Sequence, residues 1–285
     1  MAKKTSKKTK KEAKNGHGPL SFFNDAPGAY PEVTRRPLYG LAFLLPLVLV
    51  YELGIMFTDS LSDYKVRITA FSWLIDFALH IGMKPSLAKA FPGFVVVIVL
   101  LCWQLSSNHD WKIKPRWLGG MALESIIWAM PLFLIGALLE TILRNMFDSS
   151  WLLAAVEGKT AIQMAISDIV TSIGAGIYEE LIFRLIVMGI LIMLFEDVLK
   201  RPALLSIILA AVLSSVLFAV YHYIGVRTDA DGGWSFYQTN PIRISGFLFR
   251  VTAGLYFAYI FKIRGFGIAA GSHCVYDIIF FSIYE

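Results

Sequence analysis

The sequence predicts an all-α protein, a polytopic transmembrane bundle of about 7–8 membrane helices. Hydrophobic residues make up 56% of the 285 residues, whereas charged residues make up only 16%. The mean hydropathy is +0.62, a value typical of membrane proteins rather than soluble domains. Apolar runs long enough to cross a bilayer recur along the chain, and they leave no room for a sizeable soluble domain.

The positive charge of the chain is concentrated at its start. Residues 1–18 contain seven lysines and one glutamate, a balance of +6, so the remaining residues sum to −1 of the net +5. This pattern is typical of a disordered cytoplasmic tail that touches anionic lipid, and it excludes a nucleic-acid-binding surface as the source of the charge. We expect residues 1–36 to form a disordered Lys-rich tail and linker. Residues 37–285 then form the membrane domain, placed in the cell inner membrane with the N-terminus cytoplasmic.

The apolar runs give the order of the membrane helices. Each run is long enough to span, and most of the charged residues lie outside the runs. Seven spans are expected, at residues 37–57, 91–107, 118–143, 161–195, 203–222, 241–262 and 265–283. Pro202 follows a basic break and restarts a helix. The loop 108–117 is basic and therefore cytoplasmic, whereas the loop 223–240 is the longest polar insertion.

One further segment, residues 66–83, is shorter and amphipathic. Ser72, Asp76 and His80 recur every four residues and so share one helix face. The segment is therefore either a short span that lines a cavity or a helix in the plane of the membrane interface. The acids of the other apolar runs lie mostly near segment ends or on polar faces. We interpret these acids as structural: Glu52, Asp76, Glu124, Glu140 and Asp168.

Residues 161–195 form an almost unbroken apolar run with charges at its centre. Charges at that depth are costly in lipid and normally face a protein interior or a water-filled cavity. Glu180 and Arg184 are four residues apart, so they share a helix face and can pair. Glu179 lies about 100° further round an α-helix, so we expect it to point elsewhere. The pattern predicts a structural acid beside a chemical one, or else a buried salt bridge that holds two helices together.

Two later runs carry ionisable residues at helical spacing. Phe218 and His222 share a face at i, i+4, and so do His273 and Asp277. Small residues precede the glutamates and His273, and small residues let membrane helices approach closely. These small residues are Gly174, Gly176, Ala269, Ala270, Gly271 and Ser272. We therefore expect the three motifs to meet in one cavity.

The chemistry open to this set of residues is narrow. The sequence has no G-x-S-x-G elbow, no H-E-x-x-H helix and no cysteine with triad-like partners, since Cys102 and Cys274 both lie in apolar runs. A carboxylate and a histidine that activate water remain, which favours amide hydrolysis. One glutamate and two histidines are also a catalytic zinc ligand set. Glu179, His222 and His273 would be the ligands in that alternative.

The motifs E-E-x-x-x-R, F-x-x-x-H and H-x-x-x-D, in this order on successive helices, resemble those of the CPBP family of intramembrane proteases. That family includes CAAX prenyl endopeptidases of the Rce1 type and bacterial proteins linked to bacteriocin processing and self-immunity. The resemblance covers residues 118–283 and is most specific across residues 174–277. It implies a glutamic-type protease.

The resemblance also implies a role for each motif residue. Glu179 would activate the water and His222 would help to hold it. Glu180 and Arg184 would order the site, and we assign Phe218 to substrate binding. His273 and the residue at position 277 would stabilise the oxyanion. The CAAX enzyme has Asn where this chain has Asp277, which either donates when protonated or orients His273.

The function expected from these observations is an intramembrane endopeptidase that needs no cofactor and acts on a membrane-associated peptide or protein. Zinc-dependent hydrolysis is the alternative within enzymes. The alternative from another class is a non-catalytic transporter or immunity protein, with the buried acids acting as a proton relay in the transporter case. Transport is disfavoured because the charged motifs cluster in the second half of the chain, without paired broken helices in corresponding halves.

Overall fold

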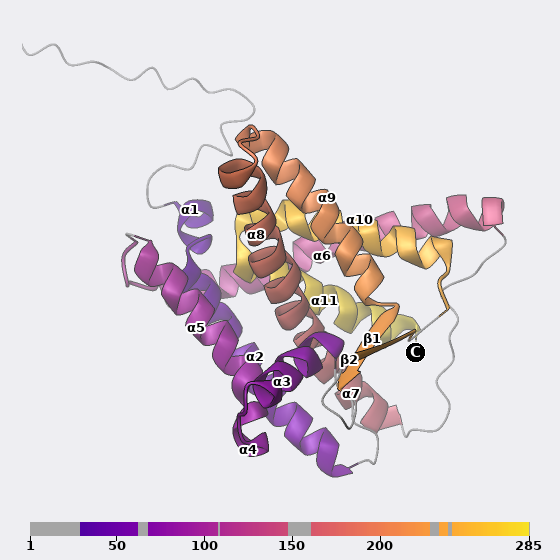
Figure 1. Cartoon of the computed structure of the whole chain (residues 1–285), viewed down its shortest axis with the longest axis horizontal. Helices are drawn as coiled ribbons and strands as arrows, with labels where there is room; N and C mark the ends of the chain where they lie inside the picture. The colour runs from indigo at the N-terminus through magenta and orange to yellow at the C-terminus, as the bar shows by residue number, and fades with distance from the viewer. Residues whose placement is uncertain are drawn as a thin grey trace, which may run out of the picture.

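The fold is an all-α helix bundle, as the sequence predicts (Figure 1). The computed structural model describes residues 29–61, 68–107, 109–147, 161–228, 234–238 and 241–284. The Lys-rich stretch of the expected tail lies outside the described residues, as does most of the loop expected after residue 143. Within the described part of the chain, the only strands are those of one short hairpin in the polar insertion after residue 222.

The helices follow the expected order, with several shifted ends. The first half contains α1 (Tyr30–Thr34), α2 (Pro37–Leu61), α3 (Thr69–His80), α4 (Pro85–Ala88), α5 (Phe91–Ser106) and α6 (Pro115–Phe147). The apolar run that contains Glu179 and Glu180, which we call the organising run, is one helical segment. It consists of α7 (Ala161–Gly174), η2 (Ala175–Glu179), η3 (Leu181–Val187), α8 (Met188–Met193) and η4 (Leu194–Val198). The remaining elements are α9 (Ala203–Tyr221), β1 (Ile224–Thr228), β2 (Trp234–Gln238), α10 (Ile244–Arg264) and α11 (Phe266–Tyr284).

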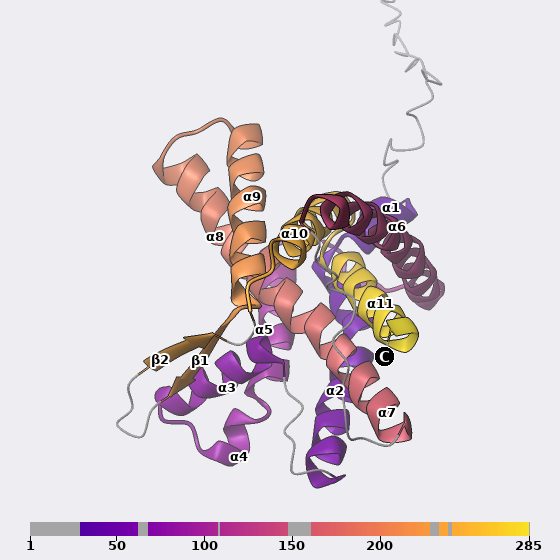
Figure 2. The same ribbon diagram turned by 90° about the vertical axis from the view of Figure 1, so that its right-hand side faces the viewer.

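Five of the described helices are long and apolar enough to cross a membrane. The spanning segments are Pro37–Met56, Pro115–Leu139, Ala203–Tyr221, Ile244–Arg264 and Phe266–Ile283. Their outward faces carry large exposed apolar side chains, which is the expected surface of an integral membrane protein. With 12 residues, α3 is too short to cross the hydrocarbon core alone, because that core is about 30 Å thick. Instead it lies beside β1 (Figure 2).

The last helix, α11, is the centre of the packing. It contacts α6, α7, α2 and α10, and its buried small residues include Ala269, Ala270 and Ser272. One core cluster joins α2, α3, α5 and the organising run, and a second joins α6, α10 and α11. The motif helices therefore meet where the two clusters adjoin. The helices α8 and α9 pack against each other as a pair (Figures 1 and 2).

A buried ionic cluster, which we call the Arg264 clamp, fixes the turn between α10 and α11. Arg264 pairs with Glu124 of α6, and its Nη1 and Nη2 donate to the carbonyl of Pro31 (2.7 Å) and the hydroxyl of Thr34 (2.9 Å). Tyr30 donates to Glu124 at 2.8 Å, and burial followed by this carboxylate raises the pKa of the phenol, which keeps it a donor. Glu124 is thus a structural acid here, as expected.

The turn itself is a single residue. Gly265 has φ +85°, a left-handed conformation that glycine adopts without strain. A Cβ at Gly265 would also lie 3.0 Å from the carbonyl oxygen of Arg35. The last part of the expected linker therefore packs against the bundle, and its residues 30–34 are helical.

Candidate active site

The two glutamates lie in a stretch of the organising run that is wound as π-helix. Glu179 ends η2, and η3 begins one residue after Glu180. A π turn contains more residues than an α turn, so successive side chains are separated by less than 100° about the axis. Neighbouring acids can therefore face the same partner. Such π segments occur frequently at functional sites.

Two glycines bring this stretch against its neighbours. A Cβ at Gly174 would lie 2.1 Å from the ring of Tyr51 on α2. A Cβ at Gly176 would lie 2.4 Å from Sγ and 2.5 Å from the backbone nitrogen of Cys274 on α11. The helix carrying the glutamates therefore touches the backbone of the helix carrying His273, as the small residues predict.

The Glu179 carboxylate is buried and faces both motif histidines. Its Oε2 atom lies 3.9 Å from Nε2 of His222 and 4.0 Å from Nε2 of His273. Its Oε1 atom accepts a 3.3 Å hydrogen bond from the Tyr221 hydroxyl, which in turn accepts the backbone N–H of Ala70 at 2.6 Å. The carboxylate is thus held from α9 on one side and approached by imidazoles on the other.

Glu180 lies on the other side of the His273 ring. Its Oε1 atom accepts from Nδ1 of His273 at 3.0 Å, and its Oε2 atom lies 3.1 Å from Nε of Arg184. The predicted pair of Glu180 with Arg184 is therefore present. Glu179 does not point away from this network, however, because both acids approach the same imidazole. The π winding accounts for the difference from the α-helical expectation.

Arg184 is fully buried and only partly satisfied. Its Nε atom is within ion-pair distance of Glu180 but is not aligned for a hydrogen bond, and neither Nη atom has a hydrogen-bond acceptor among the described residues. The ring of Phe218 covers the guanidinium, with Cζ 4.6 Å from the ring centroid. This cation–π contact compensates in part for the missing acceptors. Phe218 also packs edge-on against His222 at 4.7 Å.

The histidines have distinct environments. Nδ1 of His222 lies 2.8 Å from the Phe218 carbonyl, so this nitrogen is the donor and Nε2 faces Glu179. His273 stacks on the Phe257 ring at 4.4 Å and 16°, and its Nε2 lies 3.5 Å from Oδ2 of Asp277. Nε2 of His222 and Nε2 of His273 therefore both face the Glu179 carboxylate.

These groups share one cavity of about 280 Å³. The structure brings all of the expected site residues to it or to its wall. Glu179, Phe218, His222, His273 and Asp277 line the cavity, whereas Glu180 and Arg184 lie behind His273 and Phe218. Most of the other lining residues are apolar, from α6, α7, η2, α10, α11 and the chain preceding α3.

The zinc alternative can be compared with this geometry. A catalytic zinc needs three protein ligands converging at about 2.0–2.2 Å. Across the described ranges, no group of three or more His, Cys, Asp or Glu side chains is arranged to hold a metal ion. Nε2 of His222 and Nε2 of His273 lie 3.9 Å and 4.0 Å from Oε2 of Glu179, and these are the three residues that the zinc alternative names.

Three contributors to the site have no motif in the sequence. Tyr221 holds Glu179, Phe257 stacks on His273, and Arg250 lines the cavity. The position of Tyr221 next to His222 is a weak signal, since adjacent residues on an α-helix do not share a face. Arg250 has a clearer signal, because it is the only charged residue within the apolar run 241–261 apart from Arg243 near its start.

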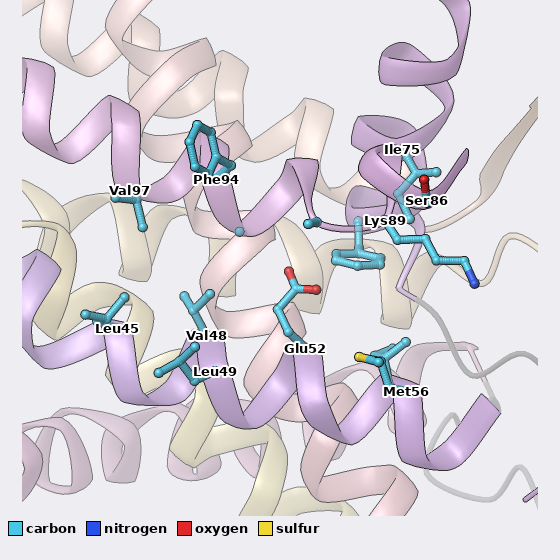
Figure 3. Close-up of a pocket in the computed structure, with 14 residues that line it drawn as sticks. Leu45, Val48, Leu49, Glu52, Met56, Ile75, Ser86, Lys89, Phe94 and Val97 are labelled. Carbon is cyan, nitrogen blue, oxygen red and sulfur yellow. The ribbon is translucent and has the colours of Figure 1, made fainter. Parts of the chain in front are cut away.

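A second cavity of about 520 Å³ lies between α2, α3 and α5 (Figure 3). Its wall is apolar except for a few residues that include Glu52, Ser86 and Lys89. The Glu52 carboxylate points into this space and accepts a 2.9 Å hydrogen bond from the Tyr178 hydroxyl. Because Tyr178 directly precedes Glu179, Glu52 of α2 contacts the π-helical stretch next to the candidate catalytic glutamate.

Comparisons with known proteins agree with the geometry. Residues 161–279 match the family model described as type II CAAX prenyl endopeptidase Rce1-like. No curated protein and no solved structure matches the chain. The matched residues include all three motifs. Residues 161–279 are therefore similar to the Rce1-like family, which is the family that the motifs resemble.

Proposed function

We propose that the protein is an intramembrane endopeptidase that hydrolyses a peptide bond of a membrane-associated peptide or protein with water activated by glutamate and histidine. One observation carries this proposal: the buried Glu179 carboxylate lies 3.9 Å and 4.0 Å from two imidazole Nε2 atoms in one cavity. A single water bridges polar groups at such separations. A general base must reach its proton directly or through one water, and this arrangement meets that requirement.

The contacts support the following roles. Glu179 takes a proton from the water, with His222 holding that water through Nε2, and the resulting hydroxide attacks the carbonyl carbon. His273, protonated on both ring nitrogens, donates from Nε2 to the oxyanion while Glu180 accepts from its Nδ1. The C–N bond then breaks, and the proton on Glu179 passes to the leaving amine. Asp277, 3.5 Å from Nε2 of His273, orients that ring.

The test is hydrolysis of a library of membrane-anchored peptides by the purified chain, read by mass spectrometry. We expect Glu179→Gln to lower the rate by about 10²- to 10⁴-fold, the contribution of a general base. The matched control is Glu196→Gln, because Glu196 is an exposed acid further along the same helical segment. Cleavage that survives in Glu179→Gln would remove Glu179 from the chemistry.

We also propose that the reaction is metal-independent. Both histidines approach one glutamate oxygen at a distance suited to a bridging water rather than to three converging ligands. Activity is therefore expected to persist after exhaustive chelation, with elemental analysis of the same sample as the check. Stoichiometric zinc, with activity lost on its removal and restored on its return, would establish the metalloenzyme alternative.

A further inference from the structure

The cavity of the candidate active site contains a cation that the proposed hydrolysis does not use. Arg250 extends from α10 and lines the cavity together with Glu179, His222 and His273. It lies within a candidate membrane span, Ile244–Arg264. A charge at such a position is costly and is retained where it has a partner or a ligand.

The guanidinium of Arg250 is held by the Tyr223 hydroxyl, in space left by a glycine. Nη1 donates to the Tyr223 hydroxyl at 2.8 Å, and Cζ lies 5.1 Å from the Tyr223 ring centroid. A Cβ at Gly246, one turn earlier on α10, would lie 3.1 Å from Nη1 and 3.2 Å from the Tyr223 hydroxyl oxygen. Glycine at this position therefore makes room for the two groups to meet.

The Arg250 guanidinium lacks an acidic partner in the described part of the chain. The two acids of the cavity, Glu179 and Asp277, are instead engaged with histidines. Among the described residues, its polar contact is with the hydroxyl of Tyr223, so the other guanidinium N–H groups are available to a ligand. The planar fork of a guanidinium matches the two oxygens of a carboxylate.

We propose that Arg250, held by Tyr223 over Gly246, binds a carboxylate group of the peptide substrate. This carboxylate is either the C-terminus of the peptide or the side chain of an Asp or Glu near the cleaved bond. The inference rests on the proposed function, since it places the anchored group in the same cavity as Glu179. Arg250 then fixes the register of the peptide relative to the activated water.

The experiment uses one library of membrane-anchored peptides synthesised in three forms. One form has a free C-terminal carboxylate, one a C-terminal amide, and one a C-terminal amide with glutamate as the last residue. Cleavage by the wild-type protein is compared with that by Arg250→Gln, Arg250→Lys and the control Lys262→Gln. Lys262 lies on the same helix, is exposed and does not line the cavity. Capture of the same peptides by Glu179→Gln, with and without Arg250→Gln, measures binding without chemistry.

We expect Arg250→Gln to raise KM for the carboxylate-bearing form by roughly 10- to 100-fold, the loss of a charge-assisted hydrogen bond. The amide form should change little, Arg250→Lys should be intermediate, and Lys262→Gln should behave as wild type. Whether the free C-terminus or the glutamate form responds identifies the source of the carboxylate.

Equal cleavage and equal capture of the carboxylate and amide forms by protein containing Arg250 would overturn the inference. Arg250-dependent capture without any cleavage would instead support the inference and overturn the proposed hydrolysis. Capture of neither form would overturn both. Size-exclusion profiles and thermal unfolding of each variant establish that it is folded before these results are compared.

Discussion

At the scale of residues, the site is an alternating row of acids and bases. Arg184 pairs with Glu180, Glu180 accepts from His273, and His273 faces Glu179, which also faces His222. Each acidic side chain therefore lies next to a basic one. Ionisable groups in a membrane interior are normally paired in this way. Glu180 is held from two sides, so its place in the row is structural.

This arrangement predicts a coupled loss of stability. Arg184→Met leaves the fully buried Glu180 without its cation, and Glu180→Gln leaves Arg184 without its anion. Each single variant should destabilise the protein by about 3–5 kcal/mol, and the double variant by less than the sum. Thermal unfolding in detergent measures these differences.

The control for this prediction is Arg36→Gln. Arg36 pairs with Glu32 at the same i, i+4 spacing but at a partly exposed site, so its loss should be below about 1 kcal/mol. Strictly additive losses in the Glu180 and Arg184 variants would show that the two side chains do not act as a pair.

The sequence predicts the pair because it is local. A spacing of four residues brings Glu180 close to Arg184 on an α-helix, and the structure contains that contact. The contacts of Phe257 with His273 and of Arg250 with Tyr223 join residues that have no regular spacing. They depend on how helices pack, so the sequence pattern contains no signal for them.

At the scale of elements, the close approach of the organising run to α11 sets the distance between glutamates and histidine. Gly176 has backbone and sulfur atoms of Cys274 where a side chain would be. Hydropathy and the positions of prolines predict the bounds of the helices. For most spans, the predicted bounds agree with those of the structure to within a few residues. The π turns and the β1–β2 hairpin were not predicted, whereas a short helix was expected where α3 lies. A change of winding leaves the hydropathy of a segment unchanged, which explains the first of these differences.

The glycine contact predicts a position-specific effect of one methyl group. Gly176→Ala should push the organising run away from α11, with a stability loss of about 1–3 kcal/mol. It should also lower the proposed hydrolysis by roughly 10²-fold, since about 1 Å of misplacement is sufficient for this. Peptide cleavage and thermal unfolding are measured on the same preparation.

Gly189→Ala is the matched control for this variant, because no other atom lies within 4 Å of a Cβ placed there. This substitution should be neutral or slightly stabilising, as alanine favours helix. If both alanine variants behaved alike, the packing argument for Gly176 would be wrong.

At the scale of the whole molecule, the Arg264 clamp joins segments that lie far apart in the sequence. It links Pro31 and Thr34 near the first span to Glu124 in α6 and to the turn before α11. The clamp contains none of the residues that line the candidate active site. It therefore contributes to the position of α11 rather than to chemistry.

Arg264→Gln should lower the stability of the folded protein by about 1.5–3 kcal/mol, since it leaves Glu124 without its charged donor. KM of the remaining folded fraction should be close to that of wild type. Unfolding curves and peptide cleavage separate the two effects, and Lys262→Gln, an exposed cation two residues away, should change neither. A large change in KM without a loss of stability would mean that the clamp acts on the cavity directly.

Because α11 is the last helix of the chain, the candidate active site is completed late in synthesis. The ribosome makes the helices in order, so the glutamates and His222 are synthesised before His273 and Asp277. Until α11 inserts, Glu180 lacks its imidazole and the face of Gly176 has no helix against it. The row of acids and bases is completed only when the fifth of the described spanning helices arrives. A nascent copy therefore has an incomplete site until α11 has been synthesised and has packed against the other helices.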